Sequence, residues 1–359
     1  MEKLKAFLKR KNIEISAKRY FIDALGAMAQ GLFASLLIGT IVKTLGQQLL
    51  HLGTNPVFEF LVTAGGFAMK AEVVGAAMAV GIGHALGASN LVLFSLVTVG
   101  AMANVTGKAG GPLAVLVIAI AANEVGVLVS KKTRVDIIVT PIVTILTGIL
   151  LTVLFAEYIG LGASQFGKLI MWATELHPFF MGILVSVIVG ILLTLPISSA
   201  AICHALGLVG LAGGAAVAGC CAQMVGFAVL SFRENRWGGL LSQGLGTSML
   251  QMPNIIKNPL IWIPATLASA ITGPVATCIF KLEMNGAAIS SGMGTCGLVG
   301  PIGVITGWFG ETSAKVPGAL DWIGLVLVCL VLPGVLSWGI GLLLRKIQWI
   351  REGDLKLPE

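Results

Sequence analysis

Long apolar segments with few charged residues dominate the chain. A helix needs about 20 apolar residues to cross the hydrocarbon core of a bilayer, because each residue adds about 1.5 Å. The windows that meet this requirement lie near residues 22–46, 60–83, 90–106, 112–130, 136–156, 178–196, 199–229, 260–280, 294–309 and 322–344. The pattern predicts an all-α polytopic membrane protein with about ten transmembrane helices.

Three segments do not fit this simple pattern. Residues 239–256 (GLLSQGLGTSMLQMPNII) and 284–303 (MNGAAISSGMGTCGLVGPIG) are rich in Gly and in small polar residues. Irregular backbone at membrane depth is tolerated only where protein buries it or where it lines a cavity, so both segments are predicted to be re-entrant hairpins. Residues 160–176 are amphipathic, which predicts a helix lying along the membrane surface between two membrane halves, 22–159 and 177–344.

Composition supports a membrane protein. Only 11% of the 359 residues are charged and 47 are Gly, whereas a soluble domain carries about 25% charged residues. This composition excludes an ordinary soluble enzyme and a disordered linker. The six cysteines lie in apolar sequence without metal-ligand spacing, so they predict buried thiols rather than a disulfide framework or a metal site.

The positive charges are placed as in a polytopic membrane protein. Basic residues concentrate within 1–21, at 131–134 and within 345–359. With ten spans, all three groups fall on one side, which the positive-inside rule identifies as the cytosol. Both termini are therefore predicted to be cytosolic, and a nucleic-acid partner is not expected. Arg233 and Arg236 lie outside by the same count, so either a span is miscounted or the 230–238 loop turns back into the protein.

Ionisable residues inside predicted spans are candidates for function, because burying them in a bilayer costs a few kcal/mol. His204 lies between apolar stretches and is interpreted either as a contact to a polar solute or as a histidine bonded to nearby backbone. Glu124 either faces a polar cavity or pairs near the cytosolic surface with Lys131. The secondary candidates are Glu72, His84, Asn104, Asn123, Gln243 and Glu311.

The amide side chains give a further signal for a polar solute. Gln243, Gln251 and Asn254 gather in the first hairpin, and Gln223 lies in the preceding span. A sugar presents many hydroxyl groups, and an amide can both donate to them and accept from them. The alternative is tight helix packing through Gly, Ser and Thr. We predict substrate contacts at His204, Gln223, Gln251, Asn254 and Glu124, with no metal, no cofactor and no assigned catalytic residue.

Short motifs near the first hairpin resemble a known family. The segment 244–269 places Pro253, then Asn258-Pro259, then Ile263-Pro264 after a Gly-rich turn. This order is similar to that in membrane IIC components of the bacterial sugar phosphotransferase system. Residues 129–150 resemble the stand-alone IIC-like subgroup that includes the perfringolysin O regulator.

The resemblance implies a function and a set of partners. It implies a IIC-type fold in a bacterial plasma membrane and a homodimer. The first membrane half would serve as the dimerisation scaffold, and the second would bind and carry a sugar by alternating access. It also implies separate IIA and IIB proteins, the latter supplying a phosphocysteine. One feature departs from the family: the sugar-contacting Glu-Pro after the Gly turn is replaced by Thr247, Ser248 and Met249.

The sequence therefore predicts a IIC permease subunit, with phosphorylation coupled only where a IIB partner exists. Two alternatives remain at this point. One is a membrane regulator that has kept the fold without phosphotransfer. The other is an ion-coupled secondary transporter that uses Glu72, Glu124 and His204 as coupling groups.

Overall fold

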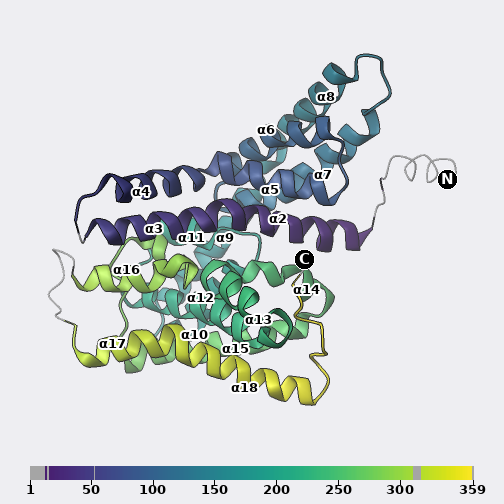
Figure 1. Cartoon of the computed structure of the whole chain (residues 1–359). Helices are drawn as coiled ribbons and strands as arrows, with labels where there is room; N and C mark the ends of the chain where they lie inside the picture. Colours follow the sequence, from purple (N-terminus) through teal and green to yellow (C-terminus); the bar gives the residue numbers. More distant parts are fainter. Residues whose placement is uncertain (1–12, 14–15, 52, 310–316, 358–359) are drawn as a thin grey trace. The chain divides into compact units, whose positions relative to one another are not determined.

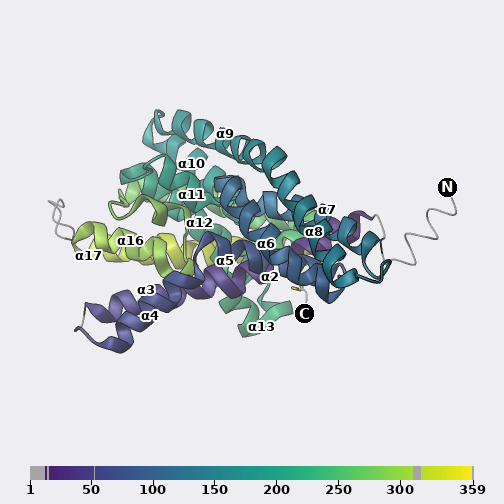
Figure 2. The same ribbon diagram turned by 90° about the horizontal axis from the view of Figure 1, so that it is seen from above.

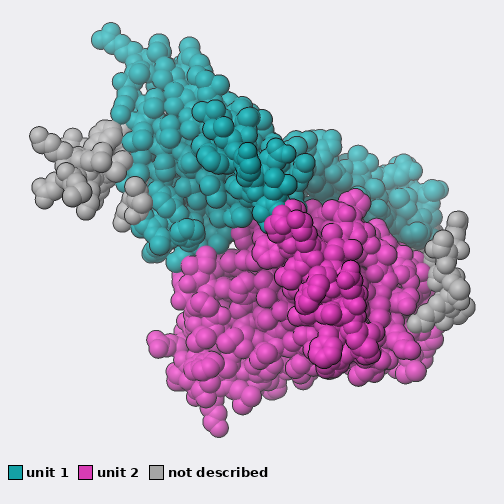
Figure 3. Space-filling view, turned by 180° about the vertical axis from the view of Figure 1, so that it is seen from behind, with its two compact units in different colours: residues 1–162 teal, residues 163–359 magenta. Residues whose placement is uncertain are grey.

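The computed structural model describes residues 13, 16–51, 53–309 and 317–357, and their regular structure is helical (Figure 1). The only β-type pairing in this part of the chain is one isolated bridge between Gly210 and Met284. The chain forms two compact units, residues 1–162 and 163–359, coloured separately in Figure 3. The prediction of an all-α fold is confirmed for the described residues.

Six helical stretches are long and apolar enough to cross a membrane, and shorter apolar helices accompany them. The long stretches are Arg19–Leu50, Asn90–Val129, Asp136–Thr174, Gly210–Leu230, Pro259–Ile279 and Ala319–Lys346. The shorter ones are Pro56–Ala68, Ala71–Ala85, Pro178–Thr194 and Cys296–Trp308. The count of about ten crossings remains a prediction.

Unit 1 is built from a series of closely packed helices. They are η1 (Arg19–Asp23), α2 (Ala24–Leu32), η2 (Phe33–Leu37), α3 (Ile38–Leu50), α4 (Pro56–Ala68), α5 (Ala71–Ala85), α6 (Asn90–Gly107), η3 (Lys108–Gly110), α7 (Gly111–Val129), α8 (Asp136–Leu151), η4 (Thr152–Ala156) and the start of α9 (Glu157–Thr174). Helices α3 and α4 run side by side as a hairpin (Figures 1 and 2). Gly75 and Gly100 face each other where α5 crosses α6, and neither position has room for a Cβ atom.

Two helix boundaries in the first half of the chain differ from those predicted. The window 60–83 is split because Lys70 is extended, with φ −59° and ψ 137°, and it lies between α4 and α5 as an exposed N-cap. The 160–176 segment is not a separate helix, since α8, η4 and α9 form one continuous stretch over Asp136–Thr174. No helix-breaking residue interrupts this stretch at Ala156–Glu157, so helical hydrogen bonding continues through it.

Unit 2 surrounds one buried helix, α12 (Gly210–Leu230). Around it lie α10 (Pro178–Thr194), α11 (Ser199–Ala205), α13 (Phe232–Leu241), η5 (Ser242–Gly246), η6 (Ser248–Gln251), α14 (Met252–Lys257), η7 (Pro259–Trp262), α15 (Ile263–Pro274), η8 (Val275–Ile279), η9 (Ala288–Gly292), η10 (Cys296–Leu298), α16 (Val299–Trp308), α17 (Ala319–Val326), η11 (Leu327–Val331) and α18 (Leu332–Lys346). Small residues allow these helices to approach α12 closely, because a glycine leaves its backbone accessible to a neighbouring helix. Gly219, for example, packs directly on the Ser186 carbonyl of α10.

The sequence His-Ala-Leu-Gly occurs at residues 84–87 and 204–207, and it forms the same helix-ending motif in both units. Gly87 has φ +69° and ends α5, whereas Gly207 has φ +59° and ends α11. The Gly87 N–H donates to the His84 carbonyl at 3.0 Å, and the Gly207 N–H donates to the His204 carbonyl at 3.1 Å. A left-handed conformation at this position favours glycine, so the local cap explains the repetition. It also splits the predicted span 199–229 into α11 and α12.

Candidate functional site

The middle of α12 is where two irregular segments of unit 2 meet. These segments are residues 242–258, called the first segment, and residues 284–308, called the second segment. They overlap residues 239–256 and 284–303, which the sequence predicts to be hairpins. Neither is one continuous α-helix, because the buried stretches 247–251 and 290–296 are built from short 3-10 helices and turns.

The first segment begins and ends beside the C-terminal end of α12. At its start, the Gln243 Nε2 donates to the Ser231 hydroxyl at 2.8 Å. At its end, the Asn258 Nδ2 donates to the Trp349 carbonyl at 2.9 Å. Trp349 follows α18, whose Arg345 donates to the Leu230 carbonyl at 3.3 Å. The chain therefore enters the unit and returns at the same end of α12.

The second segment begins and ends beside the opposite end of α12. Met284 and Gly210 exchange backbone hydrogen bonds of 2.9 Å at the first residue of α12. After the irregular stretch, α16 returns, and a Cβ at Gly307 would lie 2.9 Å from the backbone of Asn285. This segment also returns to the end from which it started.

The innermost residues of both segments reach the same turn region of α12. In the first, the Ser248 hydroxyl is hydrogen-bonded to Thr194 at 2.7 Å, and Thr194 donates to the Gln223 Oε1 at 3.3 Å. In the second, a Cβ on Gly294 would lie 2.7 Å from Cys220, and the Thr295 hydroxyl lies 3.6 Å from the Met224 Sδ. The first and second segments, which start from opposite ends of α12, thus converge near the middle of this 21-residue helix.

Gln223 is the centre of this convergence and is fully buried. Its Oε1 also accepts from the Trp262 Nε1 at 2.9 Å, and its Nε2 donates to the Thr266 hydroxyl at 3.3 Å. Helices α10, η7 and α15 therefore contribute polar atoms to one buried amide, and the first segment reaches it through Thr194. Such a network can exchange hydrogen bonds with a hydroxylated solute, because hydroxyl and amide groups both donate and accept.

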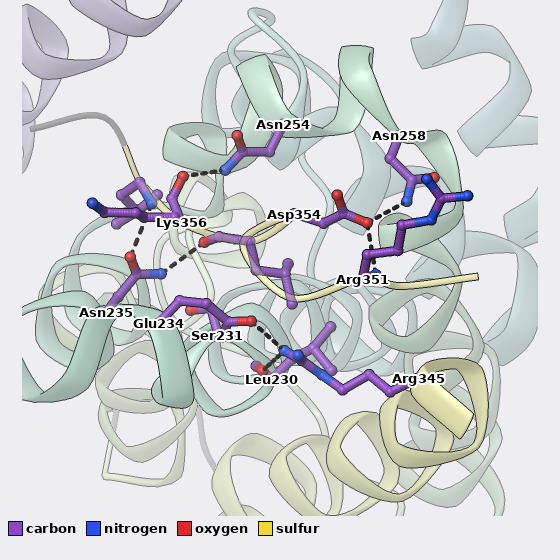
Figure 4. A network of polar contacts seen from close by, with 12 residues as sticks. Leu230, Ser231, Glu234, Asn235, Asn254, Asn258, Arg345, Arg351, Asp354 and Lys356 are labelled. Carbon is purple, nitrogen blue, oxygen red and sulfur yellow. Dashed lines mark hydrogen bonds and ion pairs between the residues drawn. The ribbon is translucent and has the colours of Figure 1, made fainter. Parts of the chain in front are cut away.

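The amides of the first segment form a second cluster toward the C-terminal end of α12. The Gln251 Nε2 donates to the Gln243 Oε1 at 2.9 Å, and the Asn254 Nδ2 donates to the Gln251 Oε1 at 2.8 Å. The same two amides also bind carbonyl oxygens of residues 355 and 356, and Figure 4 shows Asn254 directed at Lys356. Asn235 of α13 donates to the same Leu355 carbonyl as Gln251, and we call Asn235, Gln243, Gln251 and Asn254 the amide cluster.

The structure does not bring the other sequence candidates into these clusters. His84 and His204 are exposed at the ends of α5 and α11, and Glu72 is exposed in the first turn of α5. Asn104 donates to the Ala71 carbonyl at 2.7 Å and so ties α6 to the start of α5. Glu311 lies outside the described residues.

Glu124 has a partner within unit 1. Its carboxylate lies 3.4 Å from the Arg19 guanidinium, which also donates to the Leu86 carbonyl at 2.8 Å. The Arg19 contact joins α7 to the start of the N-terminal helical stretch, and it replaces the pairing with Lys131 that was considered from sequence. Since both side chains are mostly buried, this pair is a structural connection within unit 1.

Asn123 is fully buried, and neither of its amide atoms has a hydrogen-bond partner among the described residues. An unpaired buried amide costs about 1–3 kcal/mol. We therefore expect Asn123→Leu, which keeps a similar volume, to raise the stability of the protein by about 1 kcal/mol. Thermal unfolding in detergent checks this. A lower unfolding temperature for Asn123→Leu would contradict it and would indicate that the amide binds something that stabilises unit 1.

Sequence reasoning missed several residues of these clusters. Thr194 and Trp262 lie in apolar runs that give no local sign of a polar partner. Asn235 binds the segment after α18, and Arg345 binds Glu234. Each residue is separated from its partner by more than 100 residues in the sequence. Only the concentration of Gln and Asn in the first segment gave a detectable signal. No group of three or more His, Cys, Asp or Glu side chains within the described ranges is placed to hold a metal ion.

Comparison with known proteins gives one result. The family model described as "Phosphotransferase system, EIIC" matches residues 22–357, nearly the whole chain. No match was found among curated proteins or among solved structures.

Proposed function

The chain belongs to the EIIC family of the phosphotransferase system, and from this premise we propose that its sugar binds at the middle of α12, between the first and second segments. The protein is a multi-pass membrane permease subunit that transports a sugar. The family match does not favour the regulator or the ion-coupled transporter considered from sequence. The observation that supports the proposed location is the convergence of both segments on residues 220–224 at the middle of α12.

We propose that both segments are re-entrant hairpins. Each starts and finishes beside one end of α12, and the two ends are opposite. Transporters often place their solute where interrupted helices from the two sides of the membrane meet near its midplane. The arrangement also accounts for Arg233, because the 230–238 segment then lies at the same end of unit 2 as Arg345, whose guanidinium is 2.8 Å from the Glu234 carboxylate.

Among the sequence candidates, Gln223, Gln251 and Asn254 are the solute contacts that the geometry supports best. All three are buried polar groups on or beside the first segment. His204 and Glu124 are kept as candidates for testing, although His204 is exposed and Glu124 is paired with Arg19. A sugar in this region would exchange hydrogen bonds with the amides rather than meet a fixed charge.

Coupling to phosphorylation completes the proposal. Thr247, Ser248 and Met249 stand where the resemblance implies a sugar-contacting Glu-Pro, and the Ser248 hydroxyl is bonded to Thr194. We propose that hydroxyl and amide groups replace that carboxylate, and that separate IIA and IIB proteins deliver the phosphoryl group. Cytosolic termini, a homodimer and alternating access of unit 2 against a unit 1 scaffold belong to the same proposal.

A ligand screen tests the proposed function. Purified protein is heated in detergent with single hexoses, N-acetylhexosamines, hexitols and disaccharides. A sugar present at about 100 times its dissociation constant should stabilise the folded state by roughly 2.7 kcal/mol. We expect one class of sugar to raise the unfolding temperature of the wild type and to raise that of Gln251→Ala by less. His204→Ala is measured beside them as the comparison variant. Glu352→Ala, at an exposed position, is the control. The proposal is wrong if no class stabilises the wild type.

A further inference from the structure

Residues 347–357, which follow α18, lie across the first segment, and we call them the strap. Leu355 is fully buried and Ile350 is 2% exposed, so two apolar side chains anchor the strap to unit 2. Between them, Arg351, Glu352 and Gly353 are exposed. The strap is therefore held at two points, with an exposed stretch between them.

Side-chain amides bind the strap through its backbone. The Leu355 carbonyl accepts from the Asn235 Nδ2 at 2.8 Å and from the Gln251 Nε2 at 3.0 Å. The Lys356 carbonyl accepts from the Asn254 Nδ2 at 2.8 Å, and the Leu357 N–H donates to the Asn235 Oδ1 at 2.9 Å. Figure 4 shows Asn235 and Asn254 both directed at this part of the strap. Side-chain amides thus hold the strap by its main chain.

A second contact sets the direction of the strap. The Asp354 carboxylate accepts from the Asn258 Nδ2 at 2.8 Å and from the Arg351 N–H at 2.8 Å (Figure 4). Asn258 is the last residue before η7, where the first segment ends. The strap thus spans the first segment from its end at Asn258 back to the amide cluster.

The strap uses up the donors of the amides it contacts. An amide nitrogen carries two hydrogens. Those of Gln251 are directed at the Gln243 Oε1 and the Leu355 carbonyl, and those of Asn254 at the Gln251 Oε1 and the Lys356 carbonyl. While the strap is bound, neither amide has an N–H left for a sugar hydroxyl.

We propose that the strap is a tethered peptide ligand of the amide cluster, and that it must leave before Gln251 and Asn254 can bind a solute. This rests on the proposed function for the identity of the solute. A hollow of about 530 Å³ lies between the strap and the ends of α13 and α18, and it is lined by strap residues together with Arg233, Glu234 and Arg345. Release exchanges carbonyl acceptors of the peptide for hydroxyl acceptors of the sugar at the same amides.

A peptide in trans tests the tethered ligand without any sugar. The variant lacking residues 347–359 is titrated with a fluorescent synthetic peptide, IQWIREGDLKLPE, with the sequence of those residues. We expect the peptide to bind the deletion variant saturably. It should bind the full chain at least tenfold more weakly, because the chain's own strap occupies the amide cluster. The peptide carrying Leu355→Asp should bind at least tenfold more weakly, whereas the peptide carrying Glu352→Ala should bind normally. The proposal is overturned if the Leu355→Asp peptide binds as tightly as the parent peptide. It is also overturned if the parent peptide does not bind a deletion variant that is folded.

A variant of the full chain keeps the test decisive if the deletion does not fold. In Leu355→Asp, backbone amides of residues 243–257 should exchange hydrogen at least about tenfold faster than in Glu352→Ala, because a segment held by fewer buried contacts opens more often. Equal exchange in both would contradict strap release.

The sugar arm separates this inference from the proposed function. D-glucose and N-acetylglucosamine are the probes, followed by any sugar that stabilises the wild type in the screen. A probe that binds should bind at least tenfold more tightly to the deletion variant and should displace the peptide. If the peptide binds tightly and a sugar binds without displacing it, the strap does not block the solute site, and that part of the proposal is wrong. Failure of every sugar to bind either protein, with the peptide bound, would count against the solute site while the strap remains a ligand.

Discussion

Replacing Gly219 with alanine is expected to lower the stability of unit 2 by about 3 kcal/mol, which would reduce the unfolding temperature by roughly 6–12 °C. A Cβ atom at this position would overlap the Ser186 carbonyl, and its next neighbours are also backbone atoms of Ser186. Backbone cannot rotate away as a side chain can, so α10 and α12 must separate. The separation also disturbs the region of Gln223, because Gly219 is one helical turn away. Thermal unfolding of the purified protein measures the loss.

Gly339→Ala is the matched control for this prediction. Gly339 also lies inside a helix of unit 2, α18, but a Cβ there would meet no atom within 4 Å. Alanine favours a helix over glycine by about 1 kcal/mol, so this variant should be as stable as the wild type or more stable. Equal unfolding temperatures for the two variants would contradict the close packing of α10 on α12.

Replacing Gln223 with leucine is expected to weaken sugar binding by roughly 30-fold or more. The change removes an amide whose Oε1 and Nε2 bond to neighbouring side chains, and we expect at least two of these bonds to be exchanged for bonds to the sugar. Each is worth about 1 kcal/mol net, and a factor of ten corresponds to about 1.4 kcal/mol. It also leaves the Trp262 Nε1 without its acceptor. Titration of the stabilising sugar into the wild type and into Gln223→Leu measures the effect, and uptake into vesicles should fall in parallel.

The control for Gln223→Leu is Thr272→Val. Thr272 is also fully buried in unit 2, but its hydroxyl donates only to carbonyls of its own helix, at Ala268 and Ser269. This variant should bind the sugar as the wild type does. Normal sugar affinity in a folded Gln223→Leu protein would show that the amide serves packing alone.

The fold was predictable to the extent that it depends on local apolar runs. The length of such runs identified a membrane protein, and the two Gly-rich segments were placed close to their positions in the structure. Helix ends were less predictable. Lys70 and Gly207 each interrupt a long apolar window. Each break arises from the backbone conformation of one residue, while the sequence around it still has the composition of one continuous span.

The candidate site was predictable only where its residues are close in sequence. Gln243, Gln251 and Asn254 were selected together because they lie in one short segment, and they do contact one another. Their bonds to residues 355 and 356 depend on contacts across about 100 residues, which no local pattern reveals. His204 was selected because a buried histidine is costly, but the cap at Gly207 places it at an exposed helix end.

Hydrogen exchange with and without the stabilising sugar tests the central claim most directly. If the sugar binds where the two segments meet, backbone amides in 242–258 and 284–298 should exchange more slowly when it is bound, and unit 1 should be little affected. Slowing confined to unit 1, for example to 111–129 around Asn123 and Glu124, with no change in either segment, would contradict a site at the middle of α12.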